Sequence, residues 1–316
     1  MPSLSAQILK LQLRLAKPLA RFTTIEAARI AQDQLGRVTA GILKTKVTYE
    51  DVAFENFQAC FAVSHECIAP CDRVILYLHG GGYTAGQLDY AKGFGGLLAA
   101  ETRISVFCVA YRLAPENKYP AALDDAMEAY RYLLNQGFQA QNIAFVGESA
   151  GGGLEYCLLL RCKDEGLPMP KCTVAMSPWT DLTFSGASYF NNVLRDPTLI
   201  RESLAYYVLA YAAGHEREPY VSPVFGDMSG LPKSLIFVGS DEILFDDAKT
   251  LAKKLNAGGV SVELVIGSGL WHVYPLYGTP ESKRAVAQMS EFVLAELGLS
   301  GTASAEERNA AARETD

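Results

Sequence analysis

The chain has 316 residues, of which 49% are hydrophobic and 20% charged, a composition typical of a globular protein. α/β enzymes of this length often fold as one unit. The formal net charge of −7 argues against nucleic acid as a partner, because binding to phosphates requires a basic face. A small, neutral or weakly charged substrate fits this composition better.

The seven cysteines are odd in number and are spread along the chain. Disulfide-stabilised domains are usually short and dense in cysteine, so we expect reduced thiols and a cytoplasmic protein. Cys60, His65, Cys67 and Cys71 lie close together and are of metal-ligating types. Their spacing fits no regular paired zinc pattern, so we expect no metal there but a pair of strands that carries small thiols.

The first 25 residues contain no acidic residue and show a helical periodicity. Basic residues recur at helical spacing, at Lys10, Arg14, Lys17 and Arg21. An opposite apolar stripe is formed by Leu4, Ile8, Leu11, Leu15 and Leu19. The central apolar block of a secretory signal is missing, and no run reaches the roughly 18 apolar residues of a membrane span. We expect a helix that packs on the body of the protein, with a transit peptide or a membrane-surface helix as alternatives.

Short apolar runs and helical segments alternate along the rest of the chain. The expected strands lie at 46–64, 73–79, 104–110, 143–146, 172–176, 234–238 and 262–266, with helices near 120–135 and at 154–163. This alternation predicts an α/β fold with a mostly parallel central sheet and helices on both faces. We divide the chain into N-terminal helices (1–45), a core in two parts (46–180 and 221–298), an insertion over a sheet edge (181–220) and a flexible tail (299–316).

A candidate nucleophile lies between an expected strand and an expected helix. Residues 147–151 read Gly-Glu-Ser-Ala-Gly, with Ser149 at the centre. A nucleophile elbow places serine in a tight strand-to-helix turn, and glycine on both sides relieves the crowding. The hydroxyl is then presented above the sheet, close to the N-terminus of a helix that favours negative charge.

Three successive glycines follow another apolar strand, in His-Gly-Gly-Gly-Tyr at residues 79–83. Glycines let backbone N–H groups point into a cavity, which is what acyl transfer needs where the carbonyl oxygen becomes an oxyanion. The expected donors are the N–H groups of Gly81, Gly82 and Ala150. The Gly-Lys-Ser/Thr that a Walker-type phosphate loop needs downstream is missing. His79 is expected to orient the loop and to take no part in proton transfer.

The chain has only four histidines, and only His272 follows the last expected strand. This architecture requires the order serine, acid, histidine, which His272 satisfies. Asp241 follows an apolar strand and lies between Ser149 and His272, so we expect it to be the acid that fixes the imidazole tautomer. The neighbouring Glu242 and the earlier Asp181 stay open as alternatives.

These motifs resemble those of the hormone-sensitive-lipase-like esterases within the α/β-hydrolase fold. The resemblance runs from about residue 70 to 295. It rests on the glycine loop and on further runs at 111–116 (YRLAPE), 119–126 (YPAALDDA), 177–182 (SPWTDL) and 220–223 (YVSP). It implies a carboxylesterase without cofactor or metal, acting on short-to-medium acyl esters through an acyl-enzyme. It also implies a cap over the acyl pocket, formed by the N-terminal helices and the insertion.

The chain departs from the family pattern at two positions. Glu148 stands before the nucleophile where the family usually has Asp or Thr, and Gly153 stands where Asn is common. We hypothesise that Glu148 orients neighbouring groups. Relatives form dimers through the edge strand near residues 262–266, so the resemblance also allows a homodimer.

Other functions on the same scaffold stay open. A lactonase or deacetylase would use the same triad with a different pocket. A non-catalytic small-molecule receptor, as in the plant gibberellin receptors that resemble this family, would lack the catalytic histidine. Aromatic residues that could line the pocket, or equally belong to the core, are Tyr83, Trp179, Trp271 and Tyr274.

Overall fold

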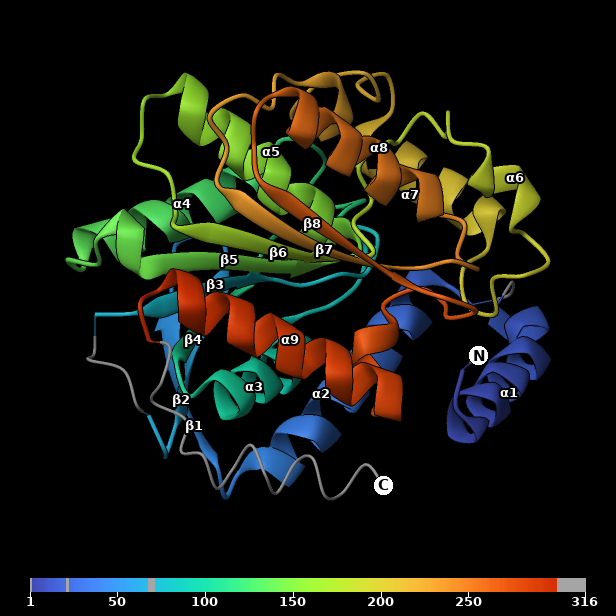
Figure 1. Cartoon of the computed structure of the whole chain (residues 1–316), viewed down its shortest axis with the longest axis horizontal. Coiled ribbons are helices and arrows are strands. Elements are labelled where there is room, and N and C mark those ends of the chain that lie inside the picture. Colours follow the sequence, from blue (N-terminus) through green and yellow to red (C-terminus); the bar gives the residue numbers. More distant parts are fainter. Residues whose placement is uncertain (1, 21–22, 68–71, 300–316) are drawn as a thin grey trace.

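The computed structural model describes residues 2–20, 23–67 and 72–299 (Figure 1). Its centre is one eight-stranded sheet with the strand order β1-β2-β4-β3-β5-β6-β7-β8. The strands are Val47–Ala53 (β1), Gln58–Ser64 (β2), Val74–Leu78 (β3), Ser105–Ala110 (β4), Ile143–Glu148 (β5), Cys172–Met176 (β6), Lys233–Gly239 (β7) and Val262–Gly267 (β8).

The six strands from β4 through β3, β5, β6 and β7 to β8 pair in parallel. The remaining pairs, β1 with β2 and β2 with β4, are antiparallel. All residues of β3, β5 and β6 are buried, as expected for parallel strands that are covered on both faces. The predicted fold class, an α/β fold with a mostly parallel central sheet, is confirmed.

Helices cover both faces of the sheet (Figure 1). The helices are Leu4–Ala20 (α1), Ile25–Leu43 (α2), Leu88–Thr102 (α3), Ala121–Asn135 (α4), Ala150–Asp164 (α5), Ser188–Asn191 (α6), Arg201–Ala212 (α7), Phe245–Ala257 (α8) and Pro280–Glu296 (α9). Helices α4, α5 and α8 pack on one face, and α3 and α9 on the other, with α2 packed outside α3. None of the described helices has the length and apolar character needed to cross a membrane.

The insertion lies at the carboxyl ends of the central strands. It contains α6 and α7, and its loop at 192–196 contacts the turn that follows β7. Asn192 donates hydrogen bonds to the backbone oxygens of Ser240 and Glu242, and a carboxylate oxygen of Asp196 accepts one from the N–H of Ile243. The insertion therefore supports the turn after β7, at the edge of the sheet where the parallel strands end.

Helix α1 packs on the body through its basic side, and its apolar stripe faces outward. Leu4, Ile8, Leu11, Leu15 and Leu19 are between 51% and 75% exposed. The side facing the body carries the buried Ala6, the partly buried Leu9 and Leu13, and the cations Lys10 and Lys17. The expected packing of this helix on the body is present, but hydrogen-bonded cations make much of the contact. Arg21 and residues 300–316 of the expected tail lie outside the described residues.

Candidate active site

Ser149 lies in a strained turn between β5, which ends at Glu148, and α5, which begins at Ala150. Its backbone has φ 55° and ψ −121°, a conformation that costs a non-glycine residue about 1–3 kcal/mol. A side chain at Gly151 is impossible here, because its Cβ would lie 2.1 Å from the carbonyl oxygen of Leu78 on β3. The tight turn predicted for residues 147–151 is therefore present, and it is packed against the neighbouring strand.

His272 comes from the turn after β8 and reaches the serine. Its Nε2 lies 2.9 Å from Oγ of Ser149, within hydrogen-bond distance. The imidazole is buried. This is the distance that a general base needs to take the proton of an attacking hydroxyl.

The carboxylate next to the imidazole belongs to Glu242. Its Oε1 lies 3.7 Å from Nδ1 of His272, too far for a hydrogen bond, and neither atom has a hydrogen-bond partner among the described residues. Its Oε2 accepts hydrogen bonds from the hydroxyl of Ser177, at 2.8 Å, and from the N–H of Gly239, at 3.3 Å. Catalytic hydrogen bonds are often long in unliganded enzymes and tighten when substrate binds. Burial raises the pKa of Glu242, against the opposite effect of His272 and Ser177.

The expected acid, Asp241, points elsewhere. Its carboxylate pairs with Nζ of Lys10 at 2.5 Å and accepts a hydrogen bond from the hydroxyl of Ser240. Consecutive residues in a turn project in different directions, and the position of two adjacent acids in the sequence does not tell which one faces the histidine. The expectation that Asp241 lies beside His272 is therefore wrong, and the carboxylate found there belongs to Glu242, one of the two alternatives.

The second alternative, Asp181, also lies away from the imidazole. Its carboxylate accepts hydrogen bonds from the backbone and hydroxyl groups of Thr183 and Ser185. It thereby closes a local turn at the start of the insertion. Of the three acids considered from the sequence, only Glu242 approaches His272.

The glycine loop after β3 has free N–H groups beside the elbow. Gly81 and Gly82 have φ of 113° and 63°, which only glycine adopts readily. Within the part of the chain that the structure describes, no group accepts a hydrogen bond from the N–H of Gly81, Gly82 or Ala150. The three expected oxyanion donors are therefore available for a ligand.

His79 supports this loop as a neutral ring. Burial lowers its pKa to about 4, so Nδ1 carries its proton at neutral pH and donates to the backbone oxygen of Gly80 at 2.7 Å. The ring stacks on Tyr111, with centroids 4.2 Å apart, and the Tyr111 hydroxyl donates to the backbone oxygen of His79. Tyr111 begins the run at 111–116 that carries part of the resemblance, so this run braces the glycine loop.

Glu148 connects the elbow to the glycine loop. Its Oε1 accepts a hydrogen bond from the N–H of Gly80 at 2.7 Å and one from the hydroxyl of Tyr90 at 3.2 Å. Burial raises the pKa of Glu148 to about 7, although the hydrogen bond from Gly80 acts against this shift. The residue before the nucleophile thus fixes the first glycine of the loop, which is the kind of role hypothesised from the sequence.

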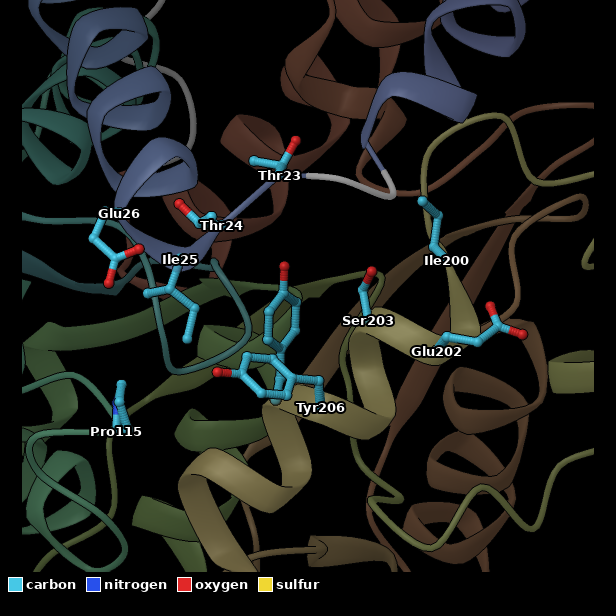
Figure 2. Close-up of a pocket in the computed structure, with 10 residues that line it drawn as sticks. Thr23, Thr24, Ile25, Glu26, Pro115, Ile200, Glu202, Ser203 and Tyr206 are labelled. Atoms are coloured by element: carbon cyan, nitrogen blue, oxygen red, sulfur yellow. The ribbon is translucent and has the colours of Figure 1, made fainter.

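A cavity of about 740 Å³ opens between the start of α2 and helix α7 (Figure 2). It is lined by Thr23, Thr24, Ile25, Glu26, Pro115, Ile200, Glu202, Ser203, Tyr206 and Tyr207. The ring of Tyr207 lies against Gly82, because a Cβ at that glycine would be 2.6 Å from the ring. Tyr207 therefore separates the cavity from the glycine loop, and neither Ser149 nor His272 lines the cavity.

The four aromatic residues considered either as pocket lining or as core residues do not line this cavity. Tyr83, Trp179, Trp271 and Tyr274 are all buried, and none of them lines the cavity. Tyr83, for example, stacks on Tyr211 of α7 with centroids 3.9 Å apart. The tyrosines that do line the cavity come from α7, in a segment where the sequence showed no functional motif.

The remaining histidines and the cysteine cluster have other surroundings. His65 contacts Thr48 and the backbone of Thr45, and His215 pairs with Glu218. Cys60 is buried, Cys67 is exposed, and Cys71 lies outside the described residues. Among the residues with a described placement, no group of three or more His, Cys, Asp or Glu could hold a metal ion.

Comparison with known proteins shows the family to which the sequence belongs. Residues 75–276 match the model of a family described as having the alpha/beta hydrolase fold. The segment includes the elbow, the glycine loop and His272. The chain belongs to this family.

The relatives of this α/β-hydrolase include several proteins named for ester hydrolysis. It is 37% identical to an acetyl-hydrolase of Streptomyces hygroscopicus over 229 residues, which are 72% of this chain and 77% of the relative. It is 36% identical to an esterase of Acinetobacter venetianus, over 71% of this chain and 75% of the relative. An ethyl acetate hydrolase of Pseudomonas putida is 32% identical, over 65% of this chain and 67% of the relative.

Solved structures agree with these relatives. A crystal structure of EstE5 soaked with p-nitrophenyl butyrate has a TM-score of 0.87 and 33% identity, covering 94% of this chain and 99% of that one. An esterase from the bacterial hormone-sensitive lipase family has a TM-score of 0.83 and 30% identity, covering 94% and 100%. The chain is a hormone-sensitive-lipase-like esterase. This esterase is therefore an enzyme that hydrolyses carboxylic esters.

Proposed function

We propose that this esterase cleaves short-to-medium acyl esters through a Ser149–His272–Glu242 triad and an acyl-enzyme intermediate. The observation that carries the proposal is the 2.9 Å contact between Nε2 of His272 and Oγ of Ser149. The Glu242 carboxylate on the opposite side of the same imidazole supports it. The three groups come from three separate turns at the carboxyl ends of parallel strands, where α/β folds bind ligands.

The mechanism follows from these positions. His272 takes the proton of Ser149 as its oxygen attacks the ester carbonyl, and Glu242 stabilises the imidazolium that forms. The N–H groups of Gly81, Gly82 and Ala150 hold the oxyanion. The alcohol leaves with the proton from His272, and the acyl group stays on the serine. Water then gives a proton to the same imidazole as it attacks the acyl carbonyl. The bond between that carbon and Oγ of Ser149 breaks, Oγ takes the proton back from His272, and the carboxylic acid is released.

The short-to-medium acyl preference rests on the cavity and on the relatives. Tyr207 lies between the cavity and Gly82, so one wall of the space next to the oxyanion loop is a rigid ring. Relatives named for acetyl and ethyl acetate hydrolysis, and a related crystal soaked with p-nitrophenyl butyrate, support small acyl groups.

A chain-length series tests this specificity. We expect kcat/KM on p-nitrophenyl esters to be highest between the acetate and hexanoate and to decline toward the laurate and palmitate. A maximum at the palmitate would contradict the proposed acyl preference. A lactone series measured beside it separates an ester preference from a lactonase.

Labelling tests the nucleophile. A fluorophosphonate probe should modify Ser149, and the modified peptide identifies the residue by mass. Ser149→Ala should abolish both labelling and turnover, with Ser290→Ala as a control at a serine remote from the elbow. Full esterase activity in Ser149→Ala would overturn the proposed mechanism.

We also propose that the enzyme works in the cytoplasm with reduced thiols. Cys60 and Cys108 lie directly opposite each other on β2 and β4, and both are free. A compartment that keeps thiols reduced is consistent with such a pair. Thiol titration of the denatured protein, isolated from cells with alkylation during lysis, should find all seven cysteines reduced; fewer would contradict this.

We further propose a homodimer through β8. This strand is at the edge of the sheet, and its Ile266 is 46% exposed. Light scattering should give twice the chain mass for the native protein and the chain mass for Ile266→Lys. A native protein that is monomeric at micromolar concentration would contradict the dimer.

A further inference from the structure

Lys10 of helix α1 contacts two turns of the active site at once. Its Nζ donates to Oδ2 of Asp241 at 2.5 Å and to the backbone oxygen of Gly269 at 2.7 Å. The side chains of Lys10 and Asp241 are only 14% and 17% exposed. Charge-assisted hydrogen bonds in such partly buried surroundings are stronger than exposed ion pairs.

The two contacted turns carry the proposed acid and base. Asp241 immediately precedes Glu242, and Gly269 lies three residues before His272. The turns also bond directly to each other, from the N–H of Asp241 to the oxygen of Leu270 and from the N–H of Gly269 to Oγ of Ser240. Lys10 therefore adds a third connection at the place where the spacing of Glu242 and His272 is determined.

Helix α1 is anchored on both sides of Lys10. Near its start, the N–H and the hydroxyl of Ser3 donate to the carboxylate of Glu281 on α9. Near its end, Nζ of Lys17 donates to the backbone oxygens of Val193 and Asp196, in the insertion loop. Lys10 thus belongs to a helix whose position is defined at three points along the active-site side of the fold.

We propose that Lys10 is a positioning residue that couples the docking of helix α1 to the distance between the Glu242 carboxylate and the His272 imidazole. This rests on the proposed triad. The ammonium group neutralises Asp241 beside the acid and holds the backbone of the histidine turn. A misplacement of about 1 Å between catalytic groups costs up to about 100-fold in rate, so loss of this connection affects turnover.

Kinetics of Lys10→Met test the proposal. We expect kcat on p-nitrophenyl butyrate to fall about 10- to 100-fold while KM stays within about twofold, because Lys10 does not line the cavity. Lys10→Arg should restore most of kcat, because guanidinium also reaches both acceptors. The matched control is Arg14→Met, one helical turn along, because Arg14 donates a hydrogen bond to the backbone oxygen of Arg195 and to neither Asp241 nor Gly269. It should retain the native kcat.

A double-mutant cycle keeps the result interpretable if Lys10→Met is unstable. Asp241→Asn removes the charged acceptor but leaves Gly269, so its loss of kcat should be smaller than that of Lys10→Met. The two effects should not add in the double variant, because both remove the same pair. Additive losses would overturn the proposal, as would folded variants with native kcat or a loss in KM alone. Glu242→Gln separates the two hypotheses. If this variant retains activity, the proposed triad is wrong. If it is inactive while Lys10→Met is fully active, the triad stands and only the positioning role of Lys10 is refuted.

Discussion

The hydroxyl of Ser177 donates a hydrogen bond to Oε2 of Glu242 at 2.8 Å, and both side chains are buried. The same hydroxyl oxygen accepts a hydrogen bond from the N–H of Val273 at 2.9 Å. One serine after β6 therefore connects the carboxylate on one side of the imidazole to the backbone next to His272.

Ser177→Ala should lower kcat by about 10-fold, because Glu242 loses a donor and the histidine turn loses an acceptor. The free energy of unfolding should also fall, by about 1–3 kcal/mol. Steady-state kinetics and urea unfolding measure the two effects. The control is Ser290→Ala, which removes a hydroxyl that donates to the backbone of Glu101, away from the active site. If Ser177→Ala loses this stability but keeps the native kcat, Ser177 only supports the fold.

The two adjacent acids should differ sharply on substitution. Glu242→Gln should reduce kcat by about 10²–10⁴-fold, since the amide cannot stabilise the imidazolium as a carboxylate does. Asp241→Asn should cost less than about 10-fold, because its carboxylate faces Lys10 instead of His272. The comparison of kcat in the two variants decides the assignment, and a larger loss in Asp241→Asn would reverse it.

Glu148 should make stability depend on pH in a defined direction. Its pKa in the fold is raised from 4.5 to about 7, so the folded state binds more protons than the unfolded state between these values. The contribution of Glu148 to the free energy of unfolding is therefore fully present below pH 4.5 and is lost as pH rises to about 7. Glu148→Gln keeps an acceptor for the N–H of Gly80 but does not titrate. In this variant the decline of the free energy of unfolding that Glu148 causes over this pH range should be absent.

Urea unfolding of wild type and Glu148→Gln between pH 4 and about 8 measures this difference. The exposed Glu50→Gln is the control and should follow the wild-type profile. A difference between wild type and Glu148→Gln that stays constant over this range would refute the raised pKa.

Tyr207 should limit the acyl chain. Tyr207→Ala removes the ring between the cavity and Gly82, so longer acyl groups gain space to be buried. Each further buried methylene is worth up to about 0.8 kcal/mol, which corresponds to about fourfold in kcat/KM. The preferred chain length in the p-nitrophenyl ester series should shift upward. Tyr206→Ala, on the exposed side of the same helix, should change it less, and an unchanged profile in Tyr207→Ala would exclude this role.

The elbow should carry a stability cost that glycine relieves. Ser149→Gly should raise the free energy of unfolding by about 1 kcal/mol, because glycine adopts φ 55° without strain. Ser149→Ala is the matched control, since it also lacks the hydroxyl but keeps the strained Cβ. Thermal and urea unfolding should rank the glycine variant above the alanine variant. Equal stability of the two would mean that the turn is not strained.

The sheet could be predicted from the sequence because its strands are short, buried apolar runs between glycine-rich turns. The run predicted at 172–176 and that of β6, Cys172–Met176, coincide, and the run predicted at 104–110 contains β4, Ser105–Ala110. Chain order then restricts the base to His272, since the other histidines precede the last strands. The contact of this base with Ser149 follows from the parallel arrangement, in which distant turns meet at one edge.

The acid could not be predicted in the same way. Asp241 and Glu242 are neighbours after the same strand, and only the direction of each side chain separates them. That direction depends on Lys10, more than 200 positions earlier in the chain, and on Ser177. The run at 177–182 supports the resemblance, but it does not show which acid Ser177 contacts. The face of α1 that packs on the body could not be predicted for a similar reason. An amphipathic pattern defines two faces of a helix, but it does not tell which of them contacts the rest of the protein.

The contact between Lys10 and its partners also orders events during synthesis. Lys10 has its acceptors at Asp241 and Gly269, and Ser3 has its acceptor at Glu281, so both residues are synthesised well before their partners. At typical translation rates, tens of seconds separate the appearance of the two sides. Helix α1 therefore emerges long before its docking surface exists, and the contacts of Lys10 form only after the turns that follow β7 and β8 have been synthesised.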